Sequence, residues 1–250
     1  MKSKKFVISD ENVREYVEKI GTWIREKVKK AGADGVVLGM SGGVDSSTVA
    51  RLCQEAKVKV HLILMPYGKS MDKKPGYNDA QELIDKFNFE YHIFDIKPAT
   101  DALKIEDDSK NSKLAEANIK PRIRMVYLYQ YAQIHNLLVI GTGNLSEGTV
   151  GYFTKWGDGA CDINPLSNIT KREVYVLAKY LKVPDNIINK KPSADLWEGQ
   201  TDEGELGITY EQIYEFILNG TSGDKQIDKK IQEKNEKSKH KLAEIMTFKN

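Results

Sequence analysis

The residues with the clearest chemical potential form one short stretch near the N-terminus. They are Gly39, Met40, Ser41, Gly42, Gly43, Val44, Asp45, Ser46 and Ser47. The apolar residues 35–38 before them are typical of a buried strand, and the spacing at 48–53 after them is typical of a helix. Free N–H groups in a helix's first turn attract anions, and glycines let the backbone approach a phosphate closely. The stretch therefore predicts a phosphate-binding turn between a strand and a helix.

This turn carries an acid and lacks the lysine of G-x-x-x-x-G-K-[ST], so it is not a Walker A loop. Asp45 would repel a polyphosphate unless a divalent cation stood between them, which implies Mg²⁺. The plainer alternative is a Gly/Ser turn with an aspartate helix cap. The full S-G-G-x-D-S-S pattern between strand and helix favours phosphate binding, and it resembles the pyrophosphate loop of the N-type ATP pyrophosphatases, which split ATP into AMP and pyrophosphate.

Three further polar segments extend the resemblance. They are residues 117–125, residues 141–147 with 151–162, and residues 191–196 with 199–203. With the phosphate loop, in this order and spacing, they make the chain similar to the ammonia-dependent NAD synthetases from about residue 10 to 246. That family amidates the nicotinate carboxylate of deamido-NAD (nicotinic acid adenine dinucleotide), using ATP, Mg²⁺ and free ammonia, and releases NAD, AMP and pyrophosphate.

This chemistry requires no nucleophilic side chain. Ammonia cannot usefully attack a carboxylate, because oxide is a very poor leaving group. Adenylation makes AMP the leaving group, and both nucleophiles belong to the substrates. The protein then has to position the reactants and stabilise charge.

The resemblance assigns roles to individual residues. It implies that Asp45 and Glu147 hold Mg²⁺ and are catalytic. The ATP-contacting residues would be Gly39 to Ser46, Thr142, Lys171 and Ser193; those for deamido-NAD would be Arg122, Lys155, Asp162, His240 and Lys241. Arginine can grip a phosphate or carboxylate with two hydrogen bonds, while lysine acts as a point charge. The alternatives are a surface lysine at 171 and a solvated charged helix around 240–241.

Two positions in these segments carry separate expectations. Asp158, in a Gly-Asp-Gly turn, could bind ammonium and accept its proton, since only neutral ammonia has a lone pair for attack. A simple turn aspartate would look the same in sequence. Pro121 replaces the alanine usual before the arginine in this family. Proline suits the first position of a helix, so a helix is expected to start there.

The surrounding pattern alternates strands with helices. Strands are predicted at 35–38, 58–65, 89–96 and 137–141; helices are predicted at 10–30 (capped by Asp10), 76–88, 98–136 with breaks near 107–109 and at 121, 170–182, 209–218 and about 224–246. This order predicts an α/β protein with a parallel sheet covered by helices on both faces. The resemblance implies the Rossmann-like adenine nucleotide alpha hydrolase fold, as one domain over 1–250 with a C-terminal helical segment at about 209–246.

Ligands of such sheets bind beyond the carboxyl ends of the strands. The loops 41–47, 66–76 and 142–160 are all expected to lie there. Residues 66–76 and 197–207 are rich in Gly, Lys and acids and poor in core residues. We expect these two segments to close over the adenylate and exclude water.

Composition excludes several classes of protein. The 250-residue chain has 40% hydrophobic and 30% charged residues, a net charge of +2 and two cysteines. The small charge gives no reason to expect a nucleic-acid or membrane partner, and two cysteines are too few for a disulfide framework. The basic start has no apolar segment behind it, and no apolar run approaches a membrane span. We therefore expect a cytoplasmic protein with small-molecule substrates.

The family also implies a homodimer with the dinucleotide near the subunit interface. Tyr127, Leu128, Tyr129 and Tyr131 offer aromatic and apolar surface for such an interface, although one buried helix would show the same residues.

Two other functions compete. Another adenylating pyrophosphatase could act on a tRNA base or a nucleotide, but the low charge and scattered cysteines disfavour it. An ATP sensor without turnover would need neither a second metal carboxylate nor the Lys155 and Asp162 loop. Because no glutaminase region accompanies these motifs, glutamine is expected to be a poor nitrogen donor.

Overall fold

The computed structural model describes residues 7–68, 75–105, 112–193, 201–245 and 247–248. The helices are α1 Val13–Ala31, α2 Val44–Glu55, α3 Pro75–Phe87, α4 Lys97–Ala102, α5 Ser112–Ala117, α6 Ile119–His135, α7 Leu145–Val150, α8 Lys171–Tyr180, α9 Asp185–Asn189, α10 Asp202–Leu206, α11 Tyr210–Asn219 and α12 Lys225–Leu242. The strands are β1 Gly35–Gly39, β2 Val60–Leu64, β3 Tyr91–Ile93 and β4 Leu137–Val139. Most of the 66–76 loop, the break at 107–109 and residues 197–200 lie outside the described residues.

The four strands form one parallel sheet in the order β3-β2-β1-β4. Strand β1 pairs with β2 and β4, and β3 is an edge strand beside β2. Every residue of β2 is buried, as expected of a strand covered on both faces. The predicted parallel α/β architecture is confirmed.

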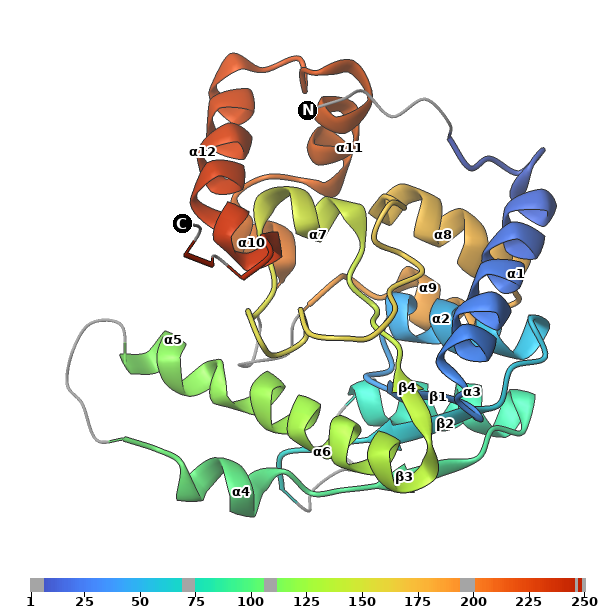
Figure 1. Ribbon diagram of the computed structural model, residues 1–250. Coiled ribbons are helices and arrows are strands. Elements are labelled where there is room, and N and C mark those ends of the chain that lie inside the picture. The colour runs from blue at the N-terminus through green and yellow to red at the C-terminus, as the bar shows by residue number, and fades with distance from the viewer. Residues whose placement is uncertain (1–6, 69–74, 106–111, 194–200, 246, 249–250) are drawn as a thin grey trace.

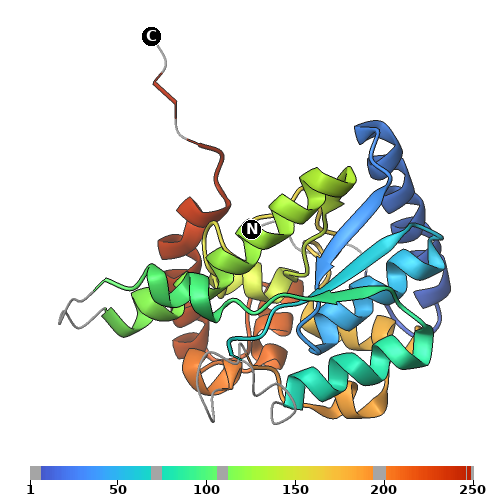
Figure 2. The same cartoon turned by 90° about the horizontal axis from the view of Figure 1, so that it is seen from below.

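Helices cover both faces of this sheet (Figures 1 and 2). Helices α1, α2, α3 and α8 enclose the larger core, which includes Leu38, Leu62 and Leu177. Helix α6 covers the opposite face, where Val37, Ile63 and Leu128 share a second core. The alternation of Val37 and Leu38 between the two cores follows from the period of two along a strand.

The C-terminal helices build a third core beside the sheet. Helices α11 and α12 pack on α7, and α11 also contacts α8 (Figure 1). Ile213, Phe216 and Ile231 are buried there together with Leu206 of α10. Segment 197–207 was expected to be poor in core residues, but its part 202–206 forms a helix that contributes Leu206 to this core.

Several boundaries differ from the predicted ones. Helix α6 begins at Ile119, so Pro121 lies within its first turn instead of starting it. Helix α1 follows the N-cap Asn12, so Asp10 does not cap it. Strand β3 has only three residues, and α7, α9 and α10 were not predicted because five or six residues show no clear periodicity.

None of the helices in the described part of the chain has the length and apolar character needed to cross a bilayer.

Candidate active site

The phosphate loop joins β1 to α2 as predicted. Gly43 is the N-cap residue of α2 and has no side chain with which to cap the first turn. Gly42 has φ +78°, and a Cβ there would lie 1.9 Å from the Gly76 carbonyl oxygen. Only glycine fits this left-handed, crowded position. The loop therefore presents N–H groups at a helix N-terminus, where an anion is stabilised.

The serines of this loop bond to one another. Ser41 Oγ lies 3.0 Å from Ser46 Oγ, and the Gly43 N–H donates to Ser41 Oγ at 3.2 Å. Ser46 Oγ in turn donates to the Gly43 carbonyl at 3.1 Å. The hydroxyls thus hold the turn in shape without a ligand.

Three charged residues predicted from separate segments meet beside this loop. Lys171 Nζ forms an ion pair with Asp45 and lies 3.6 Å from Glu147 Oε1. Asp45 is in the first turn of α2, Glu147 in the first turn of α7, and Lys171 is the first residue of α8. The Lys171 side chain is only 3% exposed, so the alternative of a surface lysine is wrong.

Asn144 orients both carboxylates, and the sequence analysis gave it no role. Its Nδ2 donates to Asp45 Oδ1 at 3.0 Å. Its Oδ1 accepts from the Glu147 N–H, while its own N–H donates to Glu147 Oε2 at 3.1 Å, a reciprocal capping box. The spacing N-x-x-E at the start of a helix is the sequence pattern that indicates this capping box of Asn144 and Glu147.

Burial sets the charge balance of this cluster. Desolvation and the neighbouring Asp45 charge raise the pKa of Glu147 well above its usual range, against the opposing charge of Lys171. Desolvation also disfavours the charged form of Lys171, but the two carboxylates outweigh it and its pKa is raised. The cluster therefore holds one buried cation between two crowded acids.

A third acid lies at the edge of the cluster, and sequence reasoning missed it. Asp202 is 5% exposed, and its Oδ2 accepts a hydrogen bond from Tyr210 at 2.8 Å. Burial raises the pKa of Asp202, and its charge acts on Glu147. Lys171 Nζ stands 5.2 Å from the centre of the Tyr210 ring. Asp202 lies within the 199–203 segment that carries the family resemblance, and this was the available signal.

A second group gathers most of the residues expected to bind deamido-NAD. Arg122 Nε donates to the Lys155 carbonyl at 3.3 Å, and Lys155 Nζ donates to the His240 carbonyl at 2.7 Å. Lys241 Nζ donates to the carbonyls of Gly151 and Phe153, both at 2.8 Å. The start of α6, the 151–159 loop and the end of α12 therefore meet, bringing basic residues from distant segments together.

The two aspartates of the 151–162 loop already serve the fold. Asp158 Oδ1 accepts the Thr154 N–H at 2.9 Å and closes the turn. Residue 158 as a whole is exposed, but desolvation of its carboxyl group by the surrounding protein raises its pKa. Asp162 accepts from the Val139 N–H at 2.7 Å and from the Tyr129 hydroxyl at 3.3 Å, beside β4 and α6.

The remaining predicted ATP contacts lie in flanking loops. Thr142 follows β4 on the way to α7, and Ser193 follows α9; both are half-buried. Thr142 follows the carboxyl end of β4, at the same edge of the sheet where the phosphate loop follows β1.

The fold is that of an α/β protein of the nucleotide-binding type, with two acids and a lysine grouped beside the loop between β1 and α2. A family model described as NAD synthase matches residues 16–249. The chain belongs to the NAD synthase family.

Individual relatives agree with this assignment. An NH(3)-dependent NAD(+) synthetase of Carboxydothermus hydrogenoformans is 43% identical, with 91% of this chain and 96% of that protein covered. A solved NMN synthetase from Francisella tularensis has a TM-score of 0.86 at 38% identity, covering 94% and 98% of the two chains. The NH3-dependent NAD synthetase from Campylobacter jejuni, in complex with the nitrate ion, has a TM-score of 0.78 at 35% identity, covering 95% and 99%.

Proposed function

We propose that this protein is an ATP-dependent carbon–nitrogen ligase that amidates deamido-NAD with ammonia, the last step in making NAD. ATP supplies the adenylyl group, and the products are NAD, AMP and pyrophosphate. The observation that carries the proposal is the Asp45–Lys171–Glu147 cluster beside an uncapped phosphate loop. The family and the relatives' names support the same reaction.

In the first step, a carboxylate oxygen of deamido-NAD attacks the α-phosphorus of ATP, and pyrophosphate leaves. The residues Gly39 to Ser46 receive the phosphates through the first-turn N–H groups of α2. Lys171 brings a buried positive charge to the same place, and we assign Thr142 and Ser193 to ATP as well. These groups act by stabilising the developing negative charge.

Mg²⁺ fits the acids of this site. Asp45 and Glu147 are hard oxygen donors from different loops, and both already face one cation, the Lys171 ammonium. We propose that these two carboxylates hold Mg²⁺, with Asn144 fixing their orientation. When bound, the ion would neutralise phosphate charge during adenylation.

In the second step, ammonia attacks the activated carbonyl carbon, and AMP leaves with the former carboxylate oxygen. We assign Arg122, Lys155, Asp162, His240 and Lys241 to deamido-NAD. The basic members of this set suit its diphosphate. Asp158, in the same loop as Lys155, is proposed to attract ammonium and take its proton.

The proposal is tested by assembling ATP, Mg²⁺, ammonium and deamido-NAD with the protein and omitting each in turn. Pyrophosphate and NAD should both appear only in the complete mixture, and glutamine should replace ammonium poorly. Turnover of ATP without deamido-NAD, or none with all four components, would contradict the proposal.

A mononucleotide acceptor is the second candidate, because the Francisella neighbour is named an NMN synthetase. The same assay with nicotinate mononucleotide in place of deamido-NAD separates the two. We expect a higher kcat/KM for the dinucleotide, and the reverse order would assign the mononucleotide as the acceptor.

A further inference from the structure

Three of the chain's four histidines gather far from the phosphate loop, near the amino-terminal ends of β2 and β3. His61 is the second residue of β2, Glu90 immediately precedes β3, and His92 is within β3. His135, at the end of α6, stacks on His61 with 5.9 Å between ring centroids. The reaction described above uses none of these residues.

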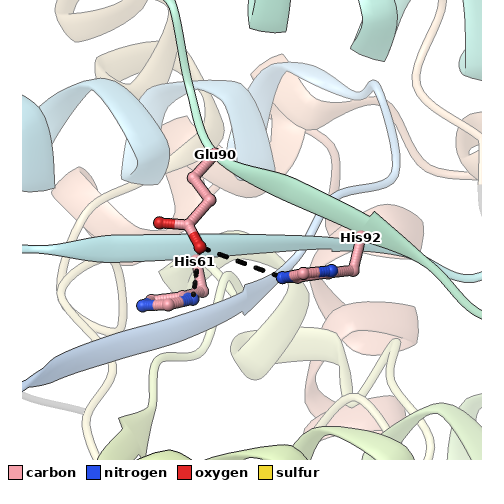
Figure 3. Close-up of side chains that lie close together, drawn as sticks. All are labelled: His61, Glu90 and His92. Carbon is pink, nitrogen blue, oxygen red and sulfur yellow. Dashed lines mark ion pairs between the residues drawn. The ribbon is translucent and has the colours of Figure 1, made fainter.

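The strand register places three of these side chains on one face of the sheet. Leu62 pairs with Tyr91, and the Leu62 N–H donates to the Glu90 carbonyl at 3.1 Å, so His61 lies beside Glu90. Because strand side chains alternate, Glu90 and His92 point to the same side as His61. Figure 3 shows the Glu90 carboxylate between the two imidazoles.

Their ligand atoms converge. Glu90 Oε1 lies 3.6 Å from His61 Nδ1 and 3.9 Å from His92 Nε2, and the three atoms are all within 4.8 Å of one another. Ligand atoms of a tetrahedral ion with bonds near 2.0–2.1 Å stand roughly 3.4 Å apart. Small movements of the exposed Glu90 and His92 side chains, 56% and 43% exposed, would close this difference.

His61 is the buried residue of the three, and its imidazole is held in place and uncharged. His61 is 4% exposed, its Nδ1 lies 2.9 Å from the Tyr131 hydroxyl, and its Nε2 has no hydrogen-bond partner among the described residues. Burial lowers the pKa of His61, so its lone pair is available at neutral pH. An incoming ion at Nδ1 would displace the hydrogen bond from Tyr131.

We propose that His61, Glu90 and His92 form a binding site for a zinc-class divalent transition-metal ion. Two imidazoles and one carboxylate suit such an ion better than Mg²⁺ or Ca²⁺, which prefer all-oxygen sets. Three protein ligands leave a coordination position open to solvent at the sheet edge. The ion joins edge strand β3 to buried β2, so its role is to stabilise this edge, away from catalysis.

The test uses the full-length, chelator-treated protein with excess Mg²⁺, which competes with Zn²⁺ for the acids of the phosphate site. Zn²⁺ is titrated by calorimetry, and Co²⁺ absorption reports nitrogen ligation. Wild type should bind one equivalent at this site. His92→Ala and Glu90→Gln, at exposed positions that the fold tolerates, should each weaken binding by about tenfold or more, since even indirect ligand support is worth about 10–100-fold.

His240→Ala is the matched control, since it removes an exposed histidine on α12 and should leave Zn²⁺ affinity unchanged. Zn²⁺ should also raise the melting temperature of wild type and of His240→Ala, but not of His92→Ala. Absence of Zn²⁺ binding in wild type, or equal binding in wild type and a Glu90→Gln/His92→Ala double variant, would overturn the proposal. In that case the three side chains lie together without forming a metal site.

Discussion

At the residue scale, the candidate site is defined by a lysine that two acids share. Lys171 Nζ contacts both Asp45 and Glu147, so in this state a side-chain cation stands where a divalent ion is proposed to bind. The ammonium group offsets the repulsion between these two neighbouring carboxylates. Binding of Mg²⁺ with ATP would free Lys171 to face the phosphates.

Removing either acid should disable adenylation while leaving the fold intact. Asp45→Asn and Glu147→Gln keep the side-chain volume but remove a metal oxygen charge, and we expect pyrophosphate release to fall by on the order of 10²-fold or more. Initial rates at saturating Mg²⁺ measure this, with circular dichroism as the check on folding. Near wild-type release by either variant would refute the shared-metal assignment.

Glu147→Gln should also stabilise the protein in the absence of metal, increasingly so at high pH. The unfolded chain ionises Glu147 near its ordinary pKa, whereas the folded protein holds the proton to higher pH. The free energy of unfolding that this group contributes therefore falls as pH rises through that window. Glutamine does not titrate and can still complete the capping box.

Urea unfolding of wild type and of Glu147→Gln, with a chelator present and between about pH 5 and 9, measures the difference between their free energies of unfolding. Each unit by which the pKa of Glu147 is raised is worth ~1.4 kcal/mol. The gain in the free energy of unfolding of the variant over wild type should be smallest near pH 5 and should grow as pH rises. A gain that shrinks with pH would mean that the attraction of Lys171 outweighs burial and that the pKa of Glu147 is lowered in the folded protein.

At the element scale, the candidate functional side chains come from long and short helices, and only the long ones could be predicted from periodicity. The long helices and the strands could be predicted to within a few residues because their periodicity spans several turns. Helix α7, with six residues, shows no such pattern, yet its capping box aims Glu147. Sequence also could not reveal that Lys171 is buried, or that Asp202 reaches the cluster, because both follow from how α8 and α10 pack.

Asn144→Ala should reduce activity far more than stability. Loss of the cap of α7 costs about 1 kcal/mol, but Asp45 and Glu147 lose a common partner, and a displaced catalytic group can cost on the order of 10²-fold. Asp224→Ala is the matched control, because the Asp224 side chain caps the first turn of α12, at the end of that helix opposite His240 and Lys241. Equal activity losses in the two variants would show that Asn144 acts only through helix stability.

A substitution at Asp158 can test its role in the nitrogen step without disrupting the Thr154–Asp158 turn. Asparagine at 158 could still accept the Thr154 N–H, so Asp158→Asn should keep the turn. We expect adenylation to proceed and amide formation to slow, with the loss shrinking as pH rises and free ammonia becomes abundant. Single-turnover formation of adenylate and NAD across about pH 7 to 9.5 measures this. If both steps fall together, Asp158 is structural; if neither falls, another group takes the proton.

At the scale of the whole molecule, the sheet separates two kinds of site. The phosphate loop and its acids lie beyond the carboxyl end of β1, as the parallel topology dictates. The histidine cluster lies at the amino-terminal ends of β2 and β3. Residues of the second site can therefore be substituted without touching the first, which makes the two proposals independently testable.

The outer face of α6 is the surface that we assign to a homodimer. Leu128 and Tyr131, expected as candidates for that surface, are buried in the core beneath the helix instead. Of the other two candidates, Tyr127 is half-buried and Tyr129 is 39% exposed. Two further apolar residues of α6, Val126 and Ile134, are 63% and 69% exposed. Apolar side chains on one exposed helix are typical of an interface between copies of a chain, where a two-fold axis buries the same patch twice.

A Val126→Lys/Ile134→Lys double variant should therefore be monomeric, whereas wild type should be a dimer by light scattering after size exclusion. Because both side chains are largely exposed, their replacement costs the monomer's core little. Tyr180→Lys, which changes an exposed aromatic residue on α8, should remain dimeric. If the dinucleotide binds near the interface, the monomeric variant should also show a raised KM for deamido-NAD with an unchanged KM for ATP. A monomeric wild type would refute the homodimer, and a dimeric double variant would place the interface on another surface.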